Sequence, residues 1–205
     1  MYILGLNAYH GGASACLIKD GELIAAAEEE RFERVKYWAG FPVHAIKYCL
    51  SEAGISVNDV DHIGISRDPN ANIVRKARYA IQRGPSPQLL LDRLRNRQVV
   101  GNISSVLCDN LNINRRDLKA SFHNVEHHRA HMASTFFVSP YENAAVLSID
   151  GMGDFTSTMW GTGSGNKFNV SGAIHFPHSI GILYTAVSQW LGFSQYGDEG
   201  KVMGL

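Results

Sequence analysis

Two histidines and an aspartate in this chain have the residue types and the spacing of a metal site. His127 and His131 are four positions apart in the run Glu126-His-His-Arg-Ala-His, so on a helix their side chains lie on one face. Two neutral imidazoles placed in this way can bind one cation. Asp150 ends an expected strand and begins the glycine-rich turn Asp150-Gly-Met-Gly. A histidine pair alone is more often structural, but the added carboxylate favours a mixed nitrogen and oxygen site, which suits Fe²⁺ or Mn²⁺.

Three neighbouring patterns are not interpreted as catalytic. The zinc-protease motif needs Glu directly after its first histidine, and here that position is His128, whose side chain points about 100° away from its neighbour's on a helix. The pair His175 and His178 encloses a proline and is interpreted as structural. The run Gly161-Thr-Gly-Ser-Gly165 resembles a dinucleotide loop, but a strand-like segment follows it, so we expect a hairpin turn there.

The composition is that of a folded chain with a formal net charge of zero. It has 205 residues, 45% of them hydrophobic, and its 19 basic and 19 acidic residues cancel. This composition excludes a disordered tail, a collagen-like chain and a highly basic nucleic-acid binder, and it is enough for one domain or two small lobes. The uncharged residues 168–197 are too polar for a membrane span. The N-terminus lacks the pattern of a signal peptide, and three scattered cysteines predict reduced, mostly buried thiols, so a cytoplasmic protein is expected.

The elements that must position these residues occur in the order strand-strand-strand-helix, twice. The first passage is expected as strands 2–7, 13–18 and 22–28, a helix from about 41 to 53, and a strand at 62–66. The second passage is expected as a strand at 118–124, a helix at 126–138, strands 144–150, 155–161 and 168–175, and a helix at 180–191. Each first strand ends in a small polar residue and glycines, which are typical of loops that hold phosphates with main-chain N–H groups. The repeat predicts an α/β protein with the duplicated fold of the actin-like, ribonuclease H-like ATPases, with its second lobe truncated.

A basic segment interrupts this pattern. Residues 67–98 contain eight Arg or Lys against two Asp, a local charge of +6, and two helical apolar stripes, one around Ile73–Ile81 and one around Leu89–Leu94. The segment Gly84-Pro-Ser-Pro lies between the two stripes. We interpret the segment as an inserted helical hairpin with a solvated basic face, and the alternative is a surface that binds an anion or a partner.

Several longer motifs together resemble the NodU/CmcH carbamoyltransferase family, the enzymes of nodulation-factor and antibiotic O-carbamoylation. These motifs follow the family order through the whole chain and are specific: Gly5-Leu-Asn-Ala-Tyr-His-Gly-Gly, Ala27-Glu-Glu-Glu-Arg-Phe, Gly40-Phe-Pro, Glu126-His-His-Arg-Ala-His, Ser148-Ile-Asp-Gly-Met-Gly and Asp198-Glu-Gly-Lys-Val-Met-Gly-Leu. Members of the family are much longer, so the chain resembles only their start.

The resemblance implies a domain plan and a reaction. Residues 1–205 would be the N-terminal part of an actin-like domain related to the tRNA threonylcarbamoyl transferases, with a first lobe of about 1–140 that includes a helical insertion of about 67–112. The second lobe would begin at about 141, and a YrdC-like domain would lie downstream and be absent here. The implied substrates are carbamoyl phosphate, ATP and a hydroxylated small molecule. Carbamoyl phosphate and ATP would give a carbamoyl adenylate, whose carbamoyl group passes to a hydroxyl of a sugar or another metabolite.

The resemblance also implies roles for particular residues. His127, His131 and Asp150 match positions that bind a metal, implied to be iron, against the nucleotide phosphates, and a further aspartate ligand would lie downstream. His10 matches a histidine expected near the phosphates or the carbamoyl group. Either His10 or His128 could act as the base for the acceptor hydroxyl. The residues expected to bind the nucleotide are Asn7, Gly11, Gly12, Gly151, Gly153 and Lys201, while Glu29 and Arg31 match motif positions that could equally form structural ion pairs.

Two other functions remain open from the sequence. A tRNA threonylcarbamoyl transferase would need a basic docking surface, which residues 67–98 could supply, although the motifs around residues 27–36 and 199–205 favour the carbamoyltransferase. A non-catalytic nucleotide-binding module of the actin-like kind is the alternative from a different class. Nucleic acid and membranes are not expected as partners, and the acceptor and the oligomeric state, including a homo-oligomer, cannot be read from these residues.

Overall fold

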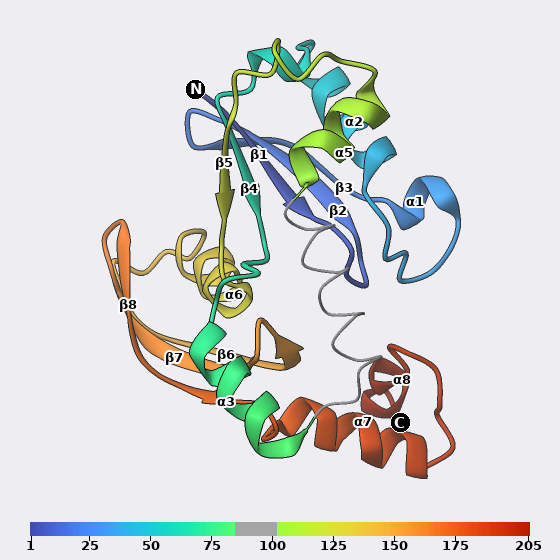
Figure 1. Ribbon diagram of the computed structural model, residues 1–205, viewed down its shortest axis with the longest axis vertical. Coiled ribbons are helices and arrows are strands. Elements are labelled where there is room, and N and C mark those ends of the chain that lie inside the picture. Colours follow the sequence, from blue (N-terminus) through green and yellow to red (C-terminus); the bar gives the residue numbers. More distant parts are fainter. Residues whose placement is uncertain (85–101) are drawn as a thin grey trace. The chain divides into compact units, whose positions relative to one another are not determined.

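The computed structural model describes residues 1–84 and 102–205. The chain forms two compact units (Figure 1). The first comprises Met1–Pro69 and Ala77–Val125, and the second comprises Asn70–Lys76 and Glu126–Leu205. The lobe boundary at about residue 140 stays a prediction. The division into compact units places the helix that follows Val125 in the second unit.

The first unit contains a five-stranded mixed sheet in the order β3-β2-β1-β4-β5. Its strands are β1 (Tyr2–Asn7), β2 (Ser14–Lys19), β3 (Glu22–Glu28), β4 (His62–Ile65) and β5 (Ser121–Asn124). The first three strands are antiparallel, whereas β4 pairs in parallel with both β1 and β5. Asp20 and Gly21 both have positive φ, as the two-residue turn between β2 and β3 requires.

Two helices contribute to the core of the first unit. Helix α2 (Val43–Glu52) packs on β2 and β3, and α5 (Ile103–Leu111) adds Ile103 and Leu107 to the same cluster. Alternate residues of the strands, such as Leu4 and Leu6, face these helices, as period-two patterning predicts. Helix α5 falls within the expected helical insertion of about 67–112, yet its apolar side is part of this core.

Four further elements belong to neither sheet, namely α1 (Glu30–Glu33), the 3₁₀ turn η1 (Val57–Asp59), α3 (Ile73–Arg83) and α8 (Glu199–Met203). Helix α3 has no buried residue and is the first helix of the predicted basic hairpin. The predicted second stripe, Leu89–Leu94, lies outside the described residues. Among the described residues, no helix is both long and apolar enough to cross a membrane.

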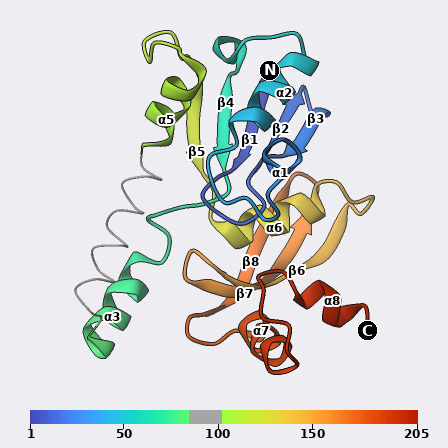
Figure 2. The same cartoon turned by 90° about the vertical axis from the view of Figure 1, so that its right-hand side faces the viewer.

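The second unit is a three-stranded antiparallel sheet with a helix on each side (Figures 1 and 2). The strands are β6 (Asn143–Gly153), β7 (Thr156–Ser164) and β8 (Lys167–His175), and the two helices are α6 (His127–Phe136) and α7 (Ile180–Trp190). Helix α6 covers one face of the sheet through a small core made of Met132, Phe136, Val146 and Met159. The N-terminal turn of α7 approaches the end of β6 from the other side.

The predicted hairpin turn at Gly161–Gly165 is wrong in its position. Residues 161–164 belong to β7, and only Gly165, with a φ of +56°, lies in the turn. The inner glycines serve close packing, because a β-carbon on Gly161 would lie 2.0 Å from the carbonyl oxygen of Asn169. A β-carbon on Gly163 would similarly lie 2.5 Å from the ring of Phe136.

The predicted fold class is confirmed. The three-stranded antiparallel meander followed by a helix occurs in both units, and the first unit adds two parallel strands beside β1, as in ribonuclease H-like folds. The prediction for the thiols is also confirmed, since Cys16, Cys49 and Cys108 are all free and the last two are buried.

Candidate metal site

Two carboxylates accept hydrogen bonds from the first main-chain N–H groups of helix α6. The side chain of Glu126 caps the helix, its Oε2 accepting from the N–H of Arg129 at 2.9 Å. Asp154 Oδ2 accepts from the N–H of His127 at 3.0 Å. Acceptors at a helix N-terminus satisfy donors that have no partner within the helix. These contacts fix the first turn of α6 and therefore the direction of the His127 side chain.

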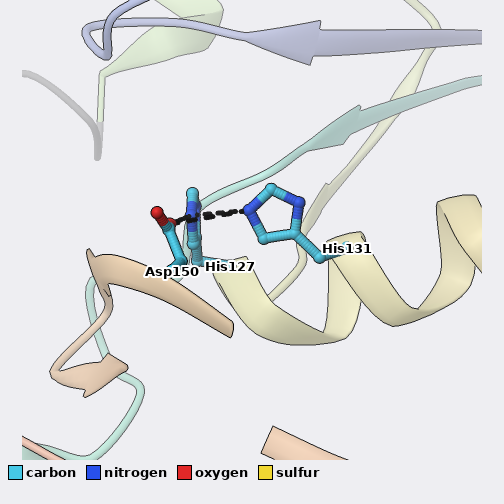
Figure 3. A group of neighbouring side chains, drawn as sticks. All are labelled: His127, His131 and Asp150. Carbon is cyan, nitrogen blue, oxygen red and sulfur yellow. Dashed lines mark hydrogen bonds and ion pairs between the residues drawn. The ribbon is translucent and has the colours of Figure 1, made fainter. Parts of the chain in front are cut away.

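The side chains of His127, His131 and Asp150 converge, as predicted (Figure 3). Nε2 of His127 lies 2.8 Å from Oδ2 of Asp150 and 3.0 Å from Nε2 of His131. Nε2 of His131 is 3.7 Å from the same carboxylate oxygen. His127 is buried, whereas the side chain of His131 is 50% exposed, so the group is open to solvent on one side.

These distances fit a shared divalent cation. Two ligand atoms that are each about 2.1 Å from a metal are about 3.0 Å apart at right angles and about 3.4 Å apart at the tetrahedral angle. The three measured separations, 2.8, 3.0 and 3.7 Å, span this range. Hydrogen bonds from His127 and then His131 hold the pKa of Asp150 well below its ordinary value, so the carboxylate is ionised. The donor set of two imidazoles and one carboxylate suits Fe²⁺, Mn²⁺ or Zn²⁺.

The two glycines after Asp150 have different roles. A β-carbon on Gly151 would meet nothing within 4 Å, so the space beside its Cα is open, although β6 continues through Gly151 to Gly153 and the predicted turn does not begin there. A β-carbon on Gly153 would lie 2.0 Å from Cδ2 of His127. Gly153 is expected from the sequence to bind the nucleotide, and in the structure it makes room for the imidazole of His127.

The histidine between the two candidate ligands is part of the core. His128 is completely buried, with Nε2 2.9 Å from the carbonyl oxygen of Thr156 and Nδ1 2.8 Å from Oγ of Ser148. A carbonyl oxygen can only accept, so Nε2 carries the proton and the serine hydroxyl donates to Nδ1. Burial lowers the pKa of His128. Because both ring nitrogens are engaged, the alternative that His128 acts as the general base is wrong.

The predicted residues of the first glycine loop lie in the first unit. Nδ2 of Asn7 donates to the carbonyl oxygen of Gly12 at 2.9 Å, and Oγ of Ser66 donates to Oδ1 of Asn7 at 3.1 Å. Asn7 therefore shapes the loop, and Gly12, with a φ of +76°, supplies a turn that other residues rarely adopt. His10 is half-buried in the same loop, next to Gly11, with Nδ1 3.2 Å from its carbonyl oxygen. The roles of these residues in binding or catalysis stay predictions.

Two charged motif positions form structural contacts. Lys201, on α8, pairs with Oδ1 of Asp198 at 2.6 Å, and its expected role toward the nucleotide stays a prediction. Glu29 is 1% exposed, and its Oε1 accepts from the main-chain N–H of His44 at 2.9 Å while its Oε2 accepts from that of Ala45 at 2.8 Å. Glu29 thus caps α2 from a distant part of the chain. Glu29, Glu33 and His44 also form a group of potential metal ligands, but this capping accounts for Glu29 without an ion.

Sequence reasoning missed the residues that support the candidate ligands. Asp154, Ser148 and Thr156 hold the first turn of α6 and the buried imidazole beside it. Asn72, from a distant segment, donates to the carbonyl oxygen of Asp154 at 3.0 Å. The only signal for Asp154 was its place directly after the motif Asp150-Gly-Met-Gly.

The fold and this site together define an α/β protein of the actin-like, ribonuclease H-like class with a cluster of two histidines and an aspartate. Residues 2–205 match the family model described as the carbamoyltransferase N-terminus. The chain therefore belongs to the carbamoyltransferase family, as the motifs predict.

Similar proteins include two that match almost the whole chain. The protein sll1178 of Synechocystis is 38% identical over all of this chain and 34% of its own length. The nodulation protein NolNO of Sinorhizobium fredii is 34% identical over 96% of this chain and 27% of its own length. The chain thus spans about a third of the length of these relatives. Among solved structures, YeaZ from Pseudomonas aeruginosa is 17% identical with a TM-score of 0.42, covering 86% of this chain and 67% of its own.

Proposed function

We propose that this chain is part of an ATP-dependent O-carbamoyltransferase, in which His127, His131 and Asp150 hold a divalent cation, Fe²⁺ or Mn²⁺. Membership of the carbamoyltransferase family supports the reaction class. The convergence of three ligand atoms at separations of 2.8 to 3.7 Å is the single observation that carries the metal site.

The proposed transfer uses a carbamoyl adenylate formed from carbamoyl phosphate, water and ATP, with phosphate and pyrophosphate released. The oxygen of the acceptor hydroxyl attacks the carbamoyl carbon, the bond from that carbon to the AMP phosphate oxygen breaks, and AMP leaves with the electron pair. The hydroxyl proton passes to a base, for which His10 is our candidate. His127, His131 and Asp150 would hold the cation, which would supply positive charge to phosphoryl oxygens. The phosphates would approach Gly151 on the side where a side chain would lie, because a β-carbon there would meet nothing within 4 Å.

The proposed site would bind the cation through one oxygen atom and two nitrogen atoms. Asp150 contributes an ionised oxygen, and the two imidazoles contribute nitrogen atoms that are neutral when they bind a metal. The half-exposed side chain of His131 leaves one side of the cluster accessible to a phosphate oxygen. The acceptor is a hydroxyl group on a small molecule.

The test has a binding arm and an activity arm. Mn²⁺ binding to the full-length protein, which would include the further aspartate ligand, is measured by calorimetry for the wild type, His127→Ala, Asp150→Asn and a control, His123→Ala, which changes an exposed histidine of β5. The proposal predicts binding by the wild type and the control, and loss of binding in the other two. Carbamoyl transfer by the full-length enzyme should be lost in the same two variants. A wild type that binds no Mn²⁺, or transfer that persists in His127→Ala, would contradict the metal site.

A second candidate function is threonylcarbamoyl transfer to tRNA. Helix α3 favours it, because its arginines Arg75, Arg78 and Arg83 are exposed on a helix with no buried residue. Binding of tRNA through such contacts would weaken steeply with salt. A titration of the chain with tRNA at several salt concentrations tests this alternative, and the absence of a salt-dependent complex would exclude it.

A further inference from the structure

We propose that Gly181 is a positioning residue for the candidate metal site. Having no side chain, it allows the first turn of α7 to contact the peptide group that joins Asp150 to Gly151, and this contact fixes the direction of the Asp150 carboxylate. The inference rests on the proposed function, because it assigns Gly181 a role toward the same three-ligand cluster.

A side chain at position 181 would meet main-chain atoms of both Asp150 and Gly151. A β-carbon on Gly181 would lie 2.6 Å from the carbonyl carbon and oxygen of Asp150, and 2.6 Å from the nitrogen of Gly151. Real β-carbons do not approach other atoms so closely. The end of a flexible side chain could rotate away, but a strand main chain can only be displaced. Any larger residue at position 181 must therefore move either α7 or the end of β6.

The peptide group in contact with Gly181 also holds the carboxylate of Asp150. The N–H of Gly151 donates to Oδ1 of Asp150 at 2.6 Å, while Oδ2 lies 2.8 Å from Nε2 of His127. The two carboxylate oxygens thus have separate partners, one anchored to the main chain and the other in the cluster. Displacement of the Asp150–Gly151 peptide moves the anchor of Oδ1, and the position of Oδ2 changes with it.

A second residue of α7 contacts the same stretch of main chain. Ser179 is the N-cap of α7, and its Oγ accepts from the N–H of Ile182 at 3.0 Å. The Ser179 hydroxyl donates to the carbonyl oxygen of Gly151 at 2.6 Å, with that of Asp150 3.2 Å away. One side chain therefore ties the start of the helix to the end of β6. The sequence alone gave no sign of this link, because 28 positions separate Ser179 from Gly151.

Backbone conformation does not account for a glycine at position 181. The residue lies within a helix and is not among the glycines with positive φ. In a helix, alanine is ordinarily more favourable than glycine. Gly200 in α8 provides the comparison, since it is also helical and a β-carbon there would meet nothing within 4 Å. The close contact with Asp150 is what distinguishes Gly181.

The experiment measures Mn²⁺ affinity, thermal stability and the geometry of Asp150. Changes in residues that orient metal ligands typically reduce metal affinity about 10- to 100-fold. We expect a loss of this size for Gly181→Ala and Ser179→Ala, and wild-type affinity for Gly200→Ala and for Ser179→Thr, which keeps the hydroxyl. Thermal melting identifies the variants that remain folded. If Gly181→Ala does not fold, the comparison of Ser179→Ala with Ser179→Thr tests whether the contact between α7 and β6 positions Asp150.

The outcomes separate this inference from the proposed function. If Asp150→Asn abolishes Mn²⁺ binding but folded Gly181→Ala and Ser179→Ala bind as the wild type does, the metal site stands and the positioning role is overturned. If the wild type binds no Mn²⁺, the proposed metal site fails. Crystal structures of the metal-free wild type and Gly181→Ala then decide, because the inference requires Oδ2 of Asp150 to move beyond hydrogen-bond distance of His127 in the variant, and an unchanged contact overturns it.

Discussion

The imidazole of His127 lies so close to the main chain of Gly153 that a β-carbon at position 153 would be 2.0 Å from its Cδ2 atom. Gly153, the second glycine of the motif Asp150-Gly-Met-Gly, therefore leaves room for the ring of His127, a candidate metal ligand. The two glycines of this motif differ in their surroundings, because a β-carbon on Gly151 would meet nothing within 4 Å whereas the histidine fills the space beside Gly153.

Replacing Gly153 should disturb the candidate metal site more than replacing Gly151. Gly153→Ala places a methyl group where the His127 ring lies, so the ring must leave its position beside Asp150. We expect Mn²⁺ affinity to fall at least about 10-fold, as for other changes that misplace a ligand. Gly151→Ala is the matched control for metal affinity, because its β-carbon meets nothing within 4 Å. Equal affinities in the two variants would show that the contact with Gly153 does not determine the ligand geometry.

His128 and His131 should differ sharply in their contribution to folding stability. His128→Ala removes a completely buried ring and leaves Ser148 and the Thr156 carbonyl without their partner. The combined loss of packing and hydrogen bonds should lower the free energy of unfolding by about 2 to 4 kcal/mol. The half-exposed His131 should tolerate alanine to within about 0.5 kcal/mol.

Urea unfolding of both variants, followed by circular dichroism without added metal, measures this difference. A loss for His128→Ala no larger than that for His131→Ala would mean that the buried ring is not held as the structure places it.

The sequence predicted those parts of the site that depend on local geometry. The spacing of His127 and His131 determines that they share a face of α6, and the strand before the glycines places Asp150, although β6 continues to Gly153 and does not end at residue 150 as predicted. The supporting residues could not be predicted, since Gly181 acts on Asp150 through a contact between distant segments. The glycines of β7 misled the prediction of a turn for the same reason, because Gly163 makes room for Phe136, which precedes it by many residues.

Glu29 should matter to stability far more than its neighbour Glu28. The buried carboxylate of Glu29 accepts the main-chain N–H groups of His44 and Ala45, whereas Glu28 is exposed on β3. In Glu29→Gln, an amide NH₂ group must face one of those donors. The free energy of unfolding should fall by about 1 to 3 kcal/mol.

Glu28→Gln is the matched control and should change stability by less than about 0.5 kcal/mol. The same pair tests whether the group of Glu29, Glu33 and His44 binds a metal, because a purely capping role predicts that added Mn²⁺ raises the melting temperature equally in the wild type and in Glu29→Gln. A smaller rise in Glu29→Gln would contradict the capping assignment.

The buried thiol of Cys49 should make the protein less stable in alkaline solution. Burial raises the pKa of Cys49 from an ordinary 9.0 to about 11, so the folded state favours the neutral thiol. Below pH 9 the thiol is neutral in both states and stability is fully present. Between about pH 9 and 11 the thiol of the unfolded chain ionises first, and up to about 2 kcal/mol of stability is lost as pH rises through that range.

Urea unfolding at pH 8 and pH 10.5 measures this loss of stability. The variant Cys49→Ser keeps a small hydrogen-bond donor near the carbonyl oxygens of Ala15 and Ala25, and it corrects for other groups that titrate in the same range. The wild type should lose more stability than the variant over this interval, and parallel losses would mean that the Cys49 thiol is not shielded from water.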